Sequence, residues 1–218
     1  MTRIKICGLS EVEGALAAAE AGADFLGLMF ADSKRQVTTK RATEIAEAVH
    51  RLSNPPKLVG VFANSTVQDV NQTADSYHLD RVQLSGAENW QYCCEIKSPI
   101  IKAIHVRESD ELKDIVNEIN TGYQIRTTET LVFLLDTHDK NTYGGTGQVF
   151  NWQLAKEVAS RFPVMVAGGL TPENVEQLVK EVCPWGVDVS SGVESNGHKD
   201  ISKIREFISV VRESEKDE

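Results

Sequence analysis

The sequence predicts a closed parallel (β/α)8 barrel, the TIM-barrel architecture, in a single domain that spans residues 1–218. Two observations predict this fold: strand-like and helix-like segments alternate eight times, and the strand-like segments are continuous apolar runs. Strands of that kind are buried on both faces, as in parallel sheets that are covered by helices. An open doubly wound sheet usually has fewer units, and Cys7–Ser10 lacks the dinucleotide fingerprint of such a fold.

The elements of the first part of the chain follow directly from local patterns. A short strand at Arg3–Gly8 precedes an alanine-rich helix at Glu11–Gly22, for which Ser10 is a candidate N-cap and Gly22 a stop. The next strands are predicted at Phe25–Phe30, Lys57–Asn64, Arg81–Gly86 and Ile100–Val106. The helices between and after them are predicted at Thr39–Leu52, Thr66–Leu79, Asn89–Lys97 and Glu108–Ile119.

The sixth predicted strand, Leu131–Asp136, is a short apolar run that ends in a carboxylate. Its apolar part is too short for a helix and long enough for a strand that is buried on both faces. The segment before it, Gly122–Thr130, is a polar insert to which the sequence assigns no role. The remaining elements are predicted as helix Asn151–Phe162, strand Val164–Leu170, helix Pro172–Val182, strand Val187–Ser191 and helix Lys199–Val211.

Composition limits the classes of partner. The chain has 218 residues, of which 41% are hydrophobic, enough to bury a substantial core. With 23 Lys and Arg against 32 Asp and Glu, the net charge of −9 argues against nucleic acid as a partner. No apolar run approaches the roughly 18 residues of a membrane span, and strand-like sequence begins by Arg3, so we expect a cytoplasmic protein that binds no membrane. The cysteines have neither metal nor disulfide spacing, and we expect thiols at Cys7, Cys93, Cys94 and Cys183.

The loops after strands seven and eight are glycine-rich and polar. Gly168 and Gly169 follow the seventh strand, and Ser190, Ser191 and Gly192 follow the eighth. Backbone N–H groups exposed by glycines ahead of a helix form an anion site, and barrels of this kind commonly hold phosphate in these two loops. We therefore expect a phosphorylated substrate, the alternative being that the glycines only form tight turns.

Cys7 and Asp136 end strands one and six on the rim where barrel enzymes place their chemistry. Alternation along the strand should turn Ile4 and Ile6 toward the helices, so Cys7 should point toward the barrel axis. A buried cysteine is more often a small hydrophobic residue, but a thiol and a carboxyl group on one rim suggest a proton-transfer pair. The glycine-rich loop Gly144–Gly147 behind Asp136 could approach a ligand or close over it.

Two further charged residues are candidates for substrate binding. Arg35, in the loop after strand two, could hold a second anionic group by a bidentate contact, or it could be a solvated arginine. Asp188 on strand eight should face into the barrel, where it could hold a sugar hydroxyl or the thiol of Cys7. Because a buried carboxylate needs a partner, Asp188 could equally pair with Lys5 or Lys102.

A set of short stretches, none of them specific alone, occurs in a fixed order along the chain. They are Lys5–Gly8, Gly22–Phe30, Val59–Phe62, Val82–Leu84, Leu135-Asp136 with Gly144–Gly147, Ala167–Leu170 with Pro172–Val175, and Asp188–Glu194 with Gly197, Lys199 and Asp200. On these stretches the chain, from Lys5 to about Phe207, resembles the phosphoribosylanthranilate isomerases of tryptophan biosynthesis.

The resemblance implies an Amadori rearrangement of N-(5'-phosphoribosyl)anthranilate to 1-(2-carboxyphenylamino)-1-deoxy-D-ribulose 5-phosphate, without cofactor or metal. For the assembly, a monomer and a homodimer are both left open by the sequence. The resemblance implies that Asp136 is the general acid that opens the ribose ring and that Cys7 is the general base that takes the proton from C2'. Arg35 would hold the anthranilate carboxylate, and the glycines and serines of loops seven and eight the phosphate. A thiol has a pKa of about 8.5, so Cys7 should need positive potential, for which Lys5 is the candidate.

Two positions depart from the family pattern. Ser85 stands where the family usually has a histidine, and Lys34 stands where a proline commonly precedes the arginine. None of the five histidines forms an obvious metal set, and only His105 and His138 are expected near the rim.

Three alternative functions remain open. A ribulose-phosphate epimerase would place metal-binding histidines at strand ends, where this chain has Phe30 and Asn64. An indole-glycerol-phosphate synthase would need a lysine at the position of Cys7. A non-catalytic barrel that binds phosphosugars would keep the anion site without turnover.

Overall fold

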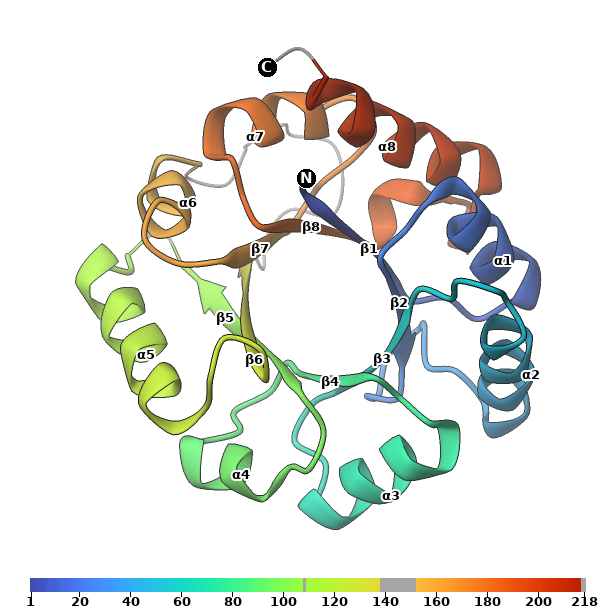
Figure 1. The fold of residues 1–218 in the computed structure, drawn as a ribbon, viewed down its shortest axis with the longest axis horizontal. Coiled ribbons are helices and arrows are strands. Elements are labelled where there is room, and N and C mark those ends of the chain that lie inside the picture. The colour runs from blue at the N-terminus through green and yellow to red at the C-terminus, as the bar shows by residue number, and fades with distance from the viewer. Residues whose placement is uncertain (108, 138–151, 217–218) are drawn as a thin grey trace.

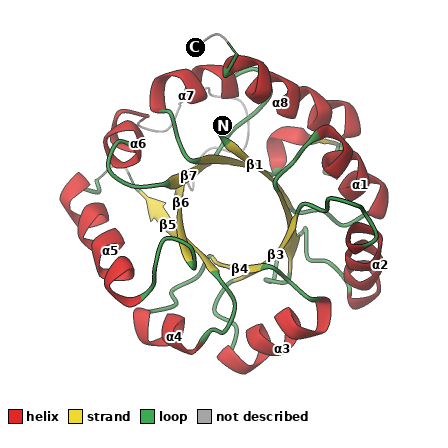
Figure 2. Cartoon of the chain, in the orientation of Figure 1, coloured by secondary structure: helices red, strands yellow, loops and turns green. Residues whose placement is uncertain are grey.

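The computed structural model describes residues 1–107, 109–137 and 152–216 of the chain. In this part of the chain, eight strands form a closed barrel in chain order, and the helices form a ring around it (Figures 1 and 2). All neighbouring strands are parallel, and Gly186–Val189 (β8) closes the ring against Arg3–Cys7 (β1). The predicted (β/α)8 barrel is confirmed.

The other strands are β2 (Phe25–Met29), β3 (Lys57–Phe62), β4 (Arg81–Leu84), β5 (Ile100–Val106), β6 (Leu131–Thr137) and β7 (Val164–Ala167). The helices are α1 (Val12–Ala21), α2 (Thr39–His50), α3 (Val67–Tyr77), α4 (Trp90–Glu95), α5 (Leu112–Ile125), α6 (Trp152–Ala159), α7 (Val175–Val182) and α8 (Ile201–Ser214). A 3-10 turn, η1 (Ser191–Val193), and a short hairpin, β9 (Glu194–Ser195) with β10 (His198–Lys199), lie between β8 and α8.

Side-chain caps define where several helices begin. The side chains of Thr38, Thr66, Asn89 and Asp200 each accept a hydrogen bond from a backbone N–H of the following turn. The predicted cap at Ser10 is wrong, because the N-cap of α1 is Glu11, whose side chain makes no capping bond. Gly22 ends α1 as predicted, with a φ of 98° that favours glycine.

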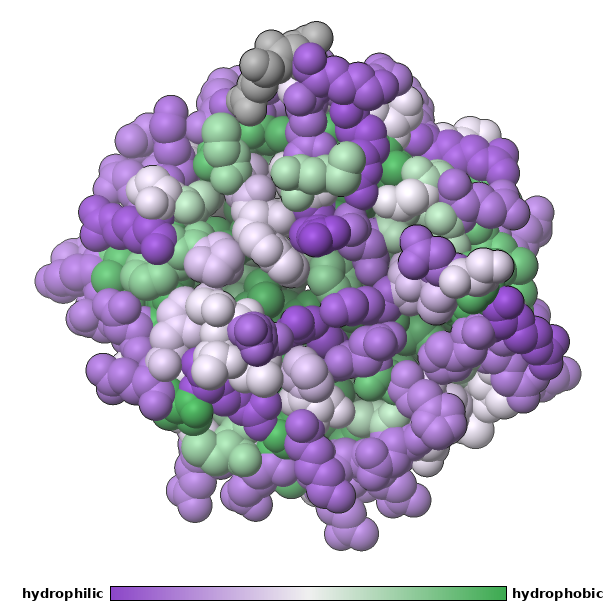
Figure 3. All heavy atoms as spheres, in the orientation of Figure 1, coloured by the Kyte–Doolittle hydropathy of each residue, from purple (hydrophilic) through white to green (hydrophobic). Residues whose placement is uncertain are grey.

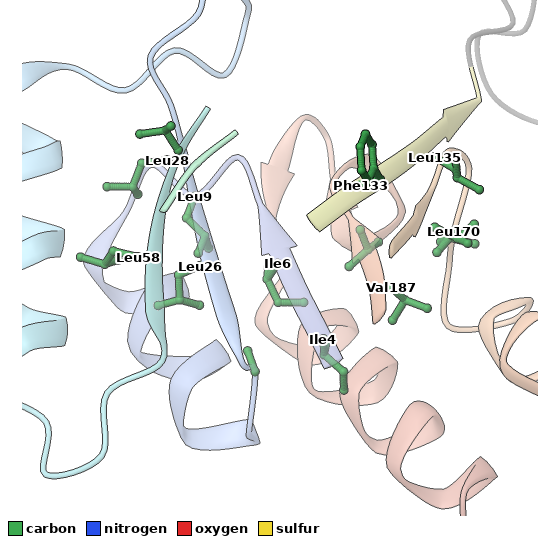
Figure 4. Close-up of a cluster of buried hydrophobic side chains, with 14 of the residues drawn as sticks. Ile4, Ile6, Leu9, Leu26, Leu28, Leu58, Phe133, Leu135, Leu170 and Val187 are labelled. Carbon is green, nitrogen blue, oxygen red and sulfur yellow. The ribbon is translucent and has the colours of Figure 1, made fainter. Parts of the chain in front are cut away.

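The buried side chains form two layers, one on each side of the barrel wall. The outer layer lies between strands and helices and contains Ile4 and Ile6 together with Val187 (Figure 4). The inner layer fills the barrel with Phe25, Val59, Ile101, Ala103, Val132, Leu134, Met165 and Ala167. The predicted alternation along β1 is confirmed, because Ile4 and Ile6 face the helices and the side chains between them face the axis.

Helix α5 differs from its prediction at both ends. It begins at Leu112 and runs on to Ile125, so the first four residues of the insert Gly122–Thr130 are its last turn. Gly122 allows this helix to pack closely, since a Cβ there would lie 2.5 Å from Phe133 and 2.6 Å from Trp90. This first part of the insert therefore packs on β6. The glycine at position 122 allows the helix to come close to Phe133 and does not end the helix.

The elements around loops seven and eight also differ from prediction. Strand β7 ends at Ala167 because Gly168 and Gly169 have positive φ angles of 96° and 64°. Helix α7 begins at Val175 rather than Pro172, since Asn174 holds the preceding residues in a turn. The β9–β10 hairpin was not predicted at all, and it carries two charged side chains of the site described below.

The surface is largely polar. In the view of Figure 3, hydrophilic side chains dominate the periphery, and hydrophobic side chains are visible between them. Among the described residues, the large hydrophobic side chains that are exposed are Met1 and Ile125. None of the described helices combines the length and the apolar content that crossing a bilayer requires.

Candidate active site

Cys7 lies at the carboxyl end of β1, inside the barrel, and its side chain is 4% exposed. Gly27 on the neighbouring strand makes room for it. A Cβ at Gly27 would lie 2.9 Å from Cys7 Sγ and 3.1 Å from Lys5 Nζ. The absence of a side chain at position 27 thus allows the thiol and the ammonium group to lie side by side on the inner wall.

Lys5 is a fully buried ammonium group that pairs with Asp188 of β8. Its Nζ donates to Asp188 Oδ1 at 2.9 Å, and the two side chains are 0% and 8% exposed. Burial lowers the pKa of Lys5, but the charge of Asp188 and the hydrogen bonds to Asp188 and Cys7 outweigh burial and raise it above its ordinary value. Lys5 is therefore charged, and the alternative that Asp188 pairs with an interior lysine is the one realised. Lys102 instead lies 3.7 Å from Glu88.

The environment of Cys7 favours the neutral thiol. Burial raises the pKa of Cys7, Lys5 and Lys199 lower it, and Asp188 raises it, with a net upward shift. The expected positive potential from Lys5 is present, but burial outweighs it. Cys7 is consequently protonated at neutral pH in the unliganded site.

Asp136 lies near the end of β6, directly opposite His105 of β5 in the strand register. Asp136 Oδ2 is 3.7 Å from His105 Nδ1, and both side chains are 35% exposed. The other ring nitrogen, Nε2, lies 2.8 Å from the carbonyl oxygen of Ser85. Gln83, buried within the barrel, donates from Nε2 to Ser85 Oγ at 3.0 Å. A polar chain thus runs along the rim from β4 to β6.

Arg35 is paired rather than solvated. Its Nε and Nη2 donate to the two carboxylate oxygens of Glu194 at 2.7 and 2.9 Å, a bidentate contact. Hydrogen bonds to Glu194 raise the pKa of Arg35 and outweigh its partial burial. In Glu194, burial raises the pKa, but Arg35 and Lys199 outweigh burial and lower it. Both partners are thus charged, and the guanidinium plane is oriented before any substrate binds.

Lys199 connects this pair to loop eight. Its Nζ lies 2.7 Å from Glu194 Oε1 and 2.8 Å from the carbonyl oxygen of Ser190. Burial lowers the pKa of Lys199 in spite of Glu194. A Cβ at Gly8 would lie 2.8 Å from Arg35 Cδ and 3.1 Å from Ser190 Oγ. Loops one, two and eight therefore meet around Gly8, next to Cys7 in the chain.

The predicted phosphate loops approach each other closely. A Cβ at Gly192 would lie 1.8 Å from the carbonyl oxygen of Leu170, so only glycine fits where loops seven and eight touch. Asn174 Nδ2 donates to the carbonyl oxygen of Gly169 at 3.0 Å and holds loop seven in place. Ser191 opens the 3-10 turn at the same end of β8 and is exposed.

Some functional candidates were visible in the sequence and others were not. Cys7, Asp136 and Asp188 lie on the inner wall at or near the strand ends, as their spacing indicated. Glu194 and Lys199 were recognised only as parts of a motif, and no local pattern connects Glu194 to Arg35, 159 residues away. The loop Gly144–Gly147 and His138 lie outside the residues that the structure describes.

Comparison with protein families gives a single result for almost the whole chain. Residues 4–210 match the family model described as N-(5'phosphoribosyl)anthranilate (PRA) isomerase. A curated relative of that name from Dehalococcoides mccartyi is 52% identical over 215 residues, which cover 99% of this chain and 98% of the relative. Another from Roseiflexus castenholzii is 44% identical over 213 residues, covering 96% and 97% of the two chains.

Solved structures give the same result. The crystal structure of phosphoribosyl anthranilate isomerase from Thermotoga maritima matches with a TM-score of 0.83 and 35% identity, over 98% of this chain and 100% of that one. A structure of such an isomerase in complex with reduced 1-(o-carboxyphenylamino)-1-deoxyribulose 5-phosphate matches with a TM-score of 0.80 and 33% identity. That match covers 98% of this chain and 100% of the other.

Proposed function

The chain belongs to the N-(5'-phosphoribosyl)anthranilate isomerase family of tryptophan biosynthesis, and we propose that Cys7 and Asp136 are the base and the acid of its reaction. The reaction converts N-(5'-phosphoribosyl)anthranilate to 1-(2-carboxyphenylamino)-1-deoxy-D-ribulose 5-phosphate. The observation that carries the assignment is the position of both side chains on the inner wall of one rim, one buried and one at the mouth.

Asp136 acts first in this proposal. Its carboxyl group donates a proton to the ribose ring oxygen, the bond from C1' to that oxygen breaks, and the nitrogen lone pair forms an iminium at C1'. The open position of Asp136, which is 35% exposed, gives a substrate access to this group.

Cys7 acts second. It removes the proton from C2', the electrons of that bond form the C1'–C2' double bond, and the positive charge on nitrogen is neutralised. The resulting enolamine takes a proton at C1' and loses the proton of its C2' hydroxyl group, so that the C1'–C2' double bond is replaced by the C2' carbonyl of the ketone. A cationic iminium near Cys7 favours its thiolate, as Lys5 does, and both oppose the effect of burial on the thiol.

The remaining site residues bind the substrate in this proposal. Arg35, held in its plane by Glu194, offers its outer edge to the anthranilate carboxylate. Asp188 keeps Lys5 beside Cys7 and lies where a sugar hydroxyl would reach it. Backbone N–H groups of loops seven and eight bind the phosphate, at Gly168, Gly169, Ser190, Ser191 and Gly192.

Loss of substrate fluorescence, with the substrate made in situ, tests the assignment. We expect Cys7→Ser and Asp136→Ala each to lower kcat by at least about 100-fold, since general acid-base groups contribute about 10² to 10⁴. Binding of a phosphate-bearing product analogue should survive in both variants. Cys94→Ser and Asp75→Ala, which change exposed residues of the same types, should match the wild type. Undiminished turnover in either active-site variant would refute the assignment of that residue.

We further propose that the enzyme acts as a monomer or homodimer in the cytoplasm. All four cysteines are thiols, which suits a reducing compartment. The isomerase from Thermotoga maritima is described as dimeric, in a structure of monomers generated from it. Light scattering on the purified chain distinguishes the two assembly states.

A further inference from the structure

Lys199 lies beside loop eight, and we propose that it is a positioning residue that turns the Ser190–Ser191 peptide so that the Ser191 N–H faces the substrate phosphate. The inference rests on the proposed function, in which loops seven and eight bind the phosphate. It gives a role to a buried lysine that the proposed mechanism does not use. That role is exerted through the backbone of loop eight.

A tight hairpin places Lys199 opposite Glu194. Strands β9 and β10 pair in the antiparallel direction, with Glu194 directly beside Lys199. The two residues that connect the strands, Asn196 and Gly197, have positive φ angles of 54° and 80°. Such angles are typical of the two-residue turn that matches the twist of paired strands. The hairpin therefore fixes Glu194 and Lys199 as cross-strand neighbours.

The ammonium group of Lys199 has two kinds of acceptor, and its side chain is 7% exposed. Nζ donates to Glu194 Oε1 at 2.7 Å and to the carbonyl oxygen of Ser190 at 2.8 Å. It also lies 3.4 Å from Ser190 Oγ. The pairing with Glu194 offsets the cost of burying the ammonium group and holds Nζ against the backbone of loop eight.

The bond from Lys199 gives the Ser190 carbonyl group its direction. Ser190 has a φ of −124° and a ψ of −82°, which are neither helical nor extended values, so regular secondary structure does not set the direction of the peptide that follows. The carbonyl oxygen also accepts from the Val193 backbone N–H of η1, at 3.4 Å. The bond from Lys199, at 2.8 Å, is the shorter one.

The geometry of a trans peptide passes this direction on to the next N–H. In a planar trans peptide the C=O and N–H groups point in opposite directions. None of the described peptides is cis. Because the Ser190 carbonyl oxygen is directed at Lys199 Nζ, the Ser191 N–H points away from Lys199.

The side of loop eight that faces away from Lys199 is the side of loop seven. Strand β8 lies between β7 and β1 in the barrel, so loop eight lies between loops seven and one. Lys199 is on the side of loop one, because a Cβ at Gly8 would lie 3.6 Å from its Nζ. On the other side, a Cβ at Gly192 would lie 1.8 Å from the carbonyl oxygen of Leu170 in loop seven. The Ser191 N–H is thus directed to the side on which the phosphate is proposed to bind.

The carboxylate that holds Lys199 also holds Arg35, which is proposed to bind the carboxylate of the substrate. Glu194 Oε1 accepts from Arg35 Nε and from Lys199 Nζ, each at 2.7 Å. The orientations of the guanidinium group and of the loop-eight peptide are therefore set together. A substrate with a phosphate group at one end and a carboxylate at the other matches this arrangement.

Lys199→Met tests the role of the ammonium group, because it removes the donor and keeps much of the length of the side chain. We expect it to weaken the binding of inorganic phosphate about tenfold, the factor that corresponds to one hydrogen bond involving a charged group. Phosphorus-31 NMR titration of the purified protein measures the dissociation constant. A loss smaller than about threefold would overturn the proposal.

Two further variants separate orientation from charge. Lys203 Nζ donates to the carbonyl oxygen of Glu194 at 2.9 Å and anchors the same hairpin, so Lys203→Met is the matched control and should bind phosphate within about twofold of the wild type. Lys199→Met/Glu194→Gln restores the net charge but not the bond to Ser190, and its phosphate affinity should remain low. Recovered affinity in the double variant, or an equal loss in Lys203→Met, would assign the effect to charge and overturn the proposal.

The amide signal of Ser191 in the wild-type protein gives a reading that requires no variant. Inorganic phosphate should shift this amide proton downfield, as expected for an N–H that donates to an anion, together with the amide protons of Gly168 and Gly169. Shifts in loop seven without a shift at Ser191 would overturn the proposal. If phosphate shifts none of the three signals, the proposed phosphate site itself is refuted, so the two failures are distinguishable.

Discussion

Lys5 is a fully buried charged side chain inside the barrel, and it lies beside Gly27, where a Cβ would be 3.1 Å from its Nζ. Its partner Asp188 comes from the last strand, 183 residues later. The pair therefore forms only when the barrel closes. It also places a positive charge beside the thiol of Cys7, which connects the closure of the fold to the chemistry of its rim.

We expect Lys5→Met to lower the free energy of unfolding by about 3–5 kcal/mol, because it leaves Asp188 as a buried charge without its counterion. The double variant Lys5→Met/Asp188→Asn should be more stable than Lys5→Met alone. Urea denaturation of the three proteins measures both differences. A double variant less stable than the single one would show that the lost pairing is not the cause.

Arg35 is the residue whose geometry matters as much as its charge. Its guanidinium group is oriented by hydrogen bonds to both carboxylate oxygens of Glu194, and a lysine side chain cannot reproduce that bidentate contact. We expect Arg35→Lys to raise KM about tenfold, a loss of about 1.4 kcal/mol in binding, with kcat nearly unchanged. Lys34→Gln, at the exposed neighbouring residue, is the control for charge alone and should leave KM within about twofold. An equal rise in KM in the two variants would exclude a specific role for the guanidinium geometry of Arg35.

Among the elements, helix α5 shows how one glycine permits close packing against the barrel. Gly122 begins the last turn of α5, and within a helix alanine is intrinsically more favourable than glycine by up to about 1 kcal/mol. The close approach of Phe133 and Trp90 opposes that gain, and overpacking typically costs about 1–3 kcal/mol.

We therefore expect Gly122→Ala to destabilise the protein by about 1–2 kcal/mol, as measured by thermal or urea unfolding. Gly14→Ala in α1 is the matched control, since its Cβ would lie 3.5 Å from Leu9 Cδ2, an ordinary contact. That control should be neutral or stabilising. If both variants are stabilising, helix propensity rather than packing sets the outcome at Gly122.

For the whole molecule, the closing helix α8 is tied to the first strands near the base of the barrel. Arg212 of α8 donates to the carbonyl oxygen of Thr2 at 2.6 Å and to Asp24 Oδ2 at 2.8 Å. Asp24 also accepts from the Ile4 backbone N–H at 2.9 Å and from Arg3 at 2.8 Å. Burial raises the pKa of Asp24, but these donors outweigh burial and lower it.

The lowered pKa of Asp24 predicts loss of stability in acid. A carboxyl group with a depressed folded-state pKa stabilises the fold above its unfolded value, about 3.9, and this contribution is lost as pH falls through the folded-state pKa. We expect Asp24→Asn to be less stable than the wild type at pH 7 and the difference to shrink below about pH 4. Urea midpoints measured between pH 3 and pH 7 test this. A difference that does not change with pH would assign the effect to packing.

The sequence by itself determined the architecture and the two candidate catalytic residues. Alternating apolar strands and amphipathic helices specify which face of each element is buried, and strand ends in a parallel barrel converge on one rim. Cys7 and Asp136 could be placed on that rim because each directly continues an apolar strand. Local periodicity is sufficient for such inferences.

The tertiary structure alone decided which charged groups meet. From the sequence, Asp188 could have paired with Lys5 or with Lys102, and the structure shows the pair with Lys5. The contact of Arg35 with Glu194 depends on a hairpin that no periodic pattern predicts. The proximity of His105 and Asp136 depends on strand register. The close packing of Gly122 in α5 against Phe133 and Trp90 likewise depends on how the helix meets the barrel. The physical reason is that contacts between residues far apart in the sequence depend on how the barrel closes. Local sequence patterns carry no information about the distance in space between such residues.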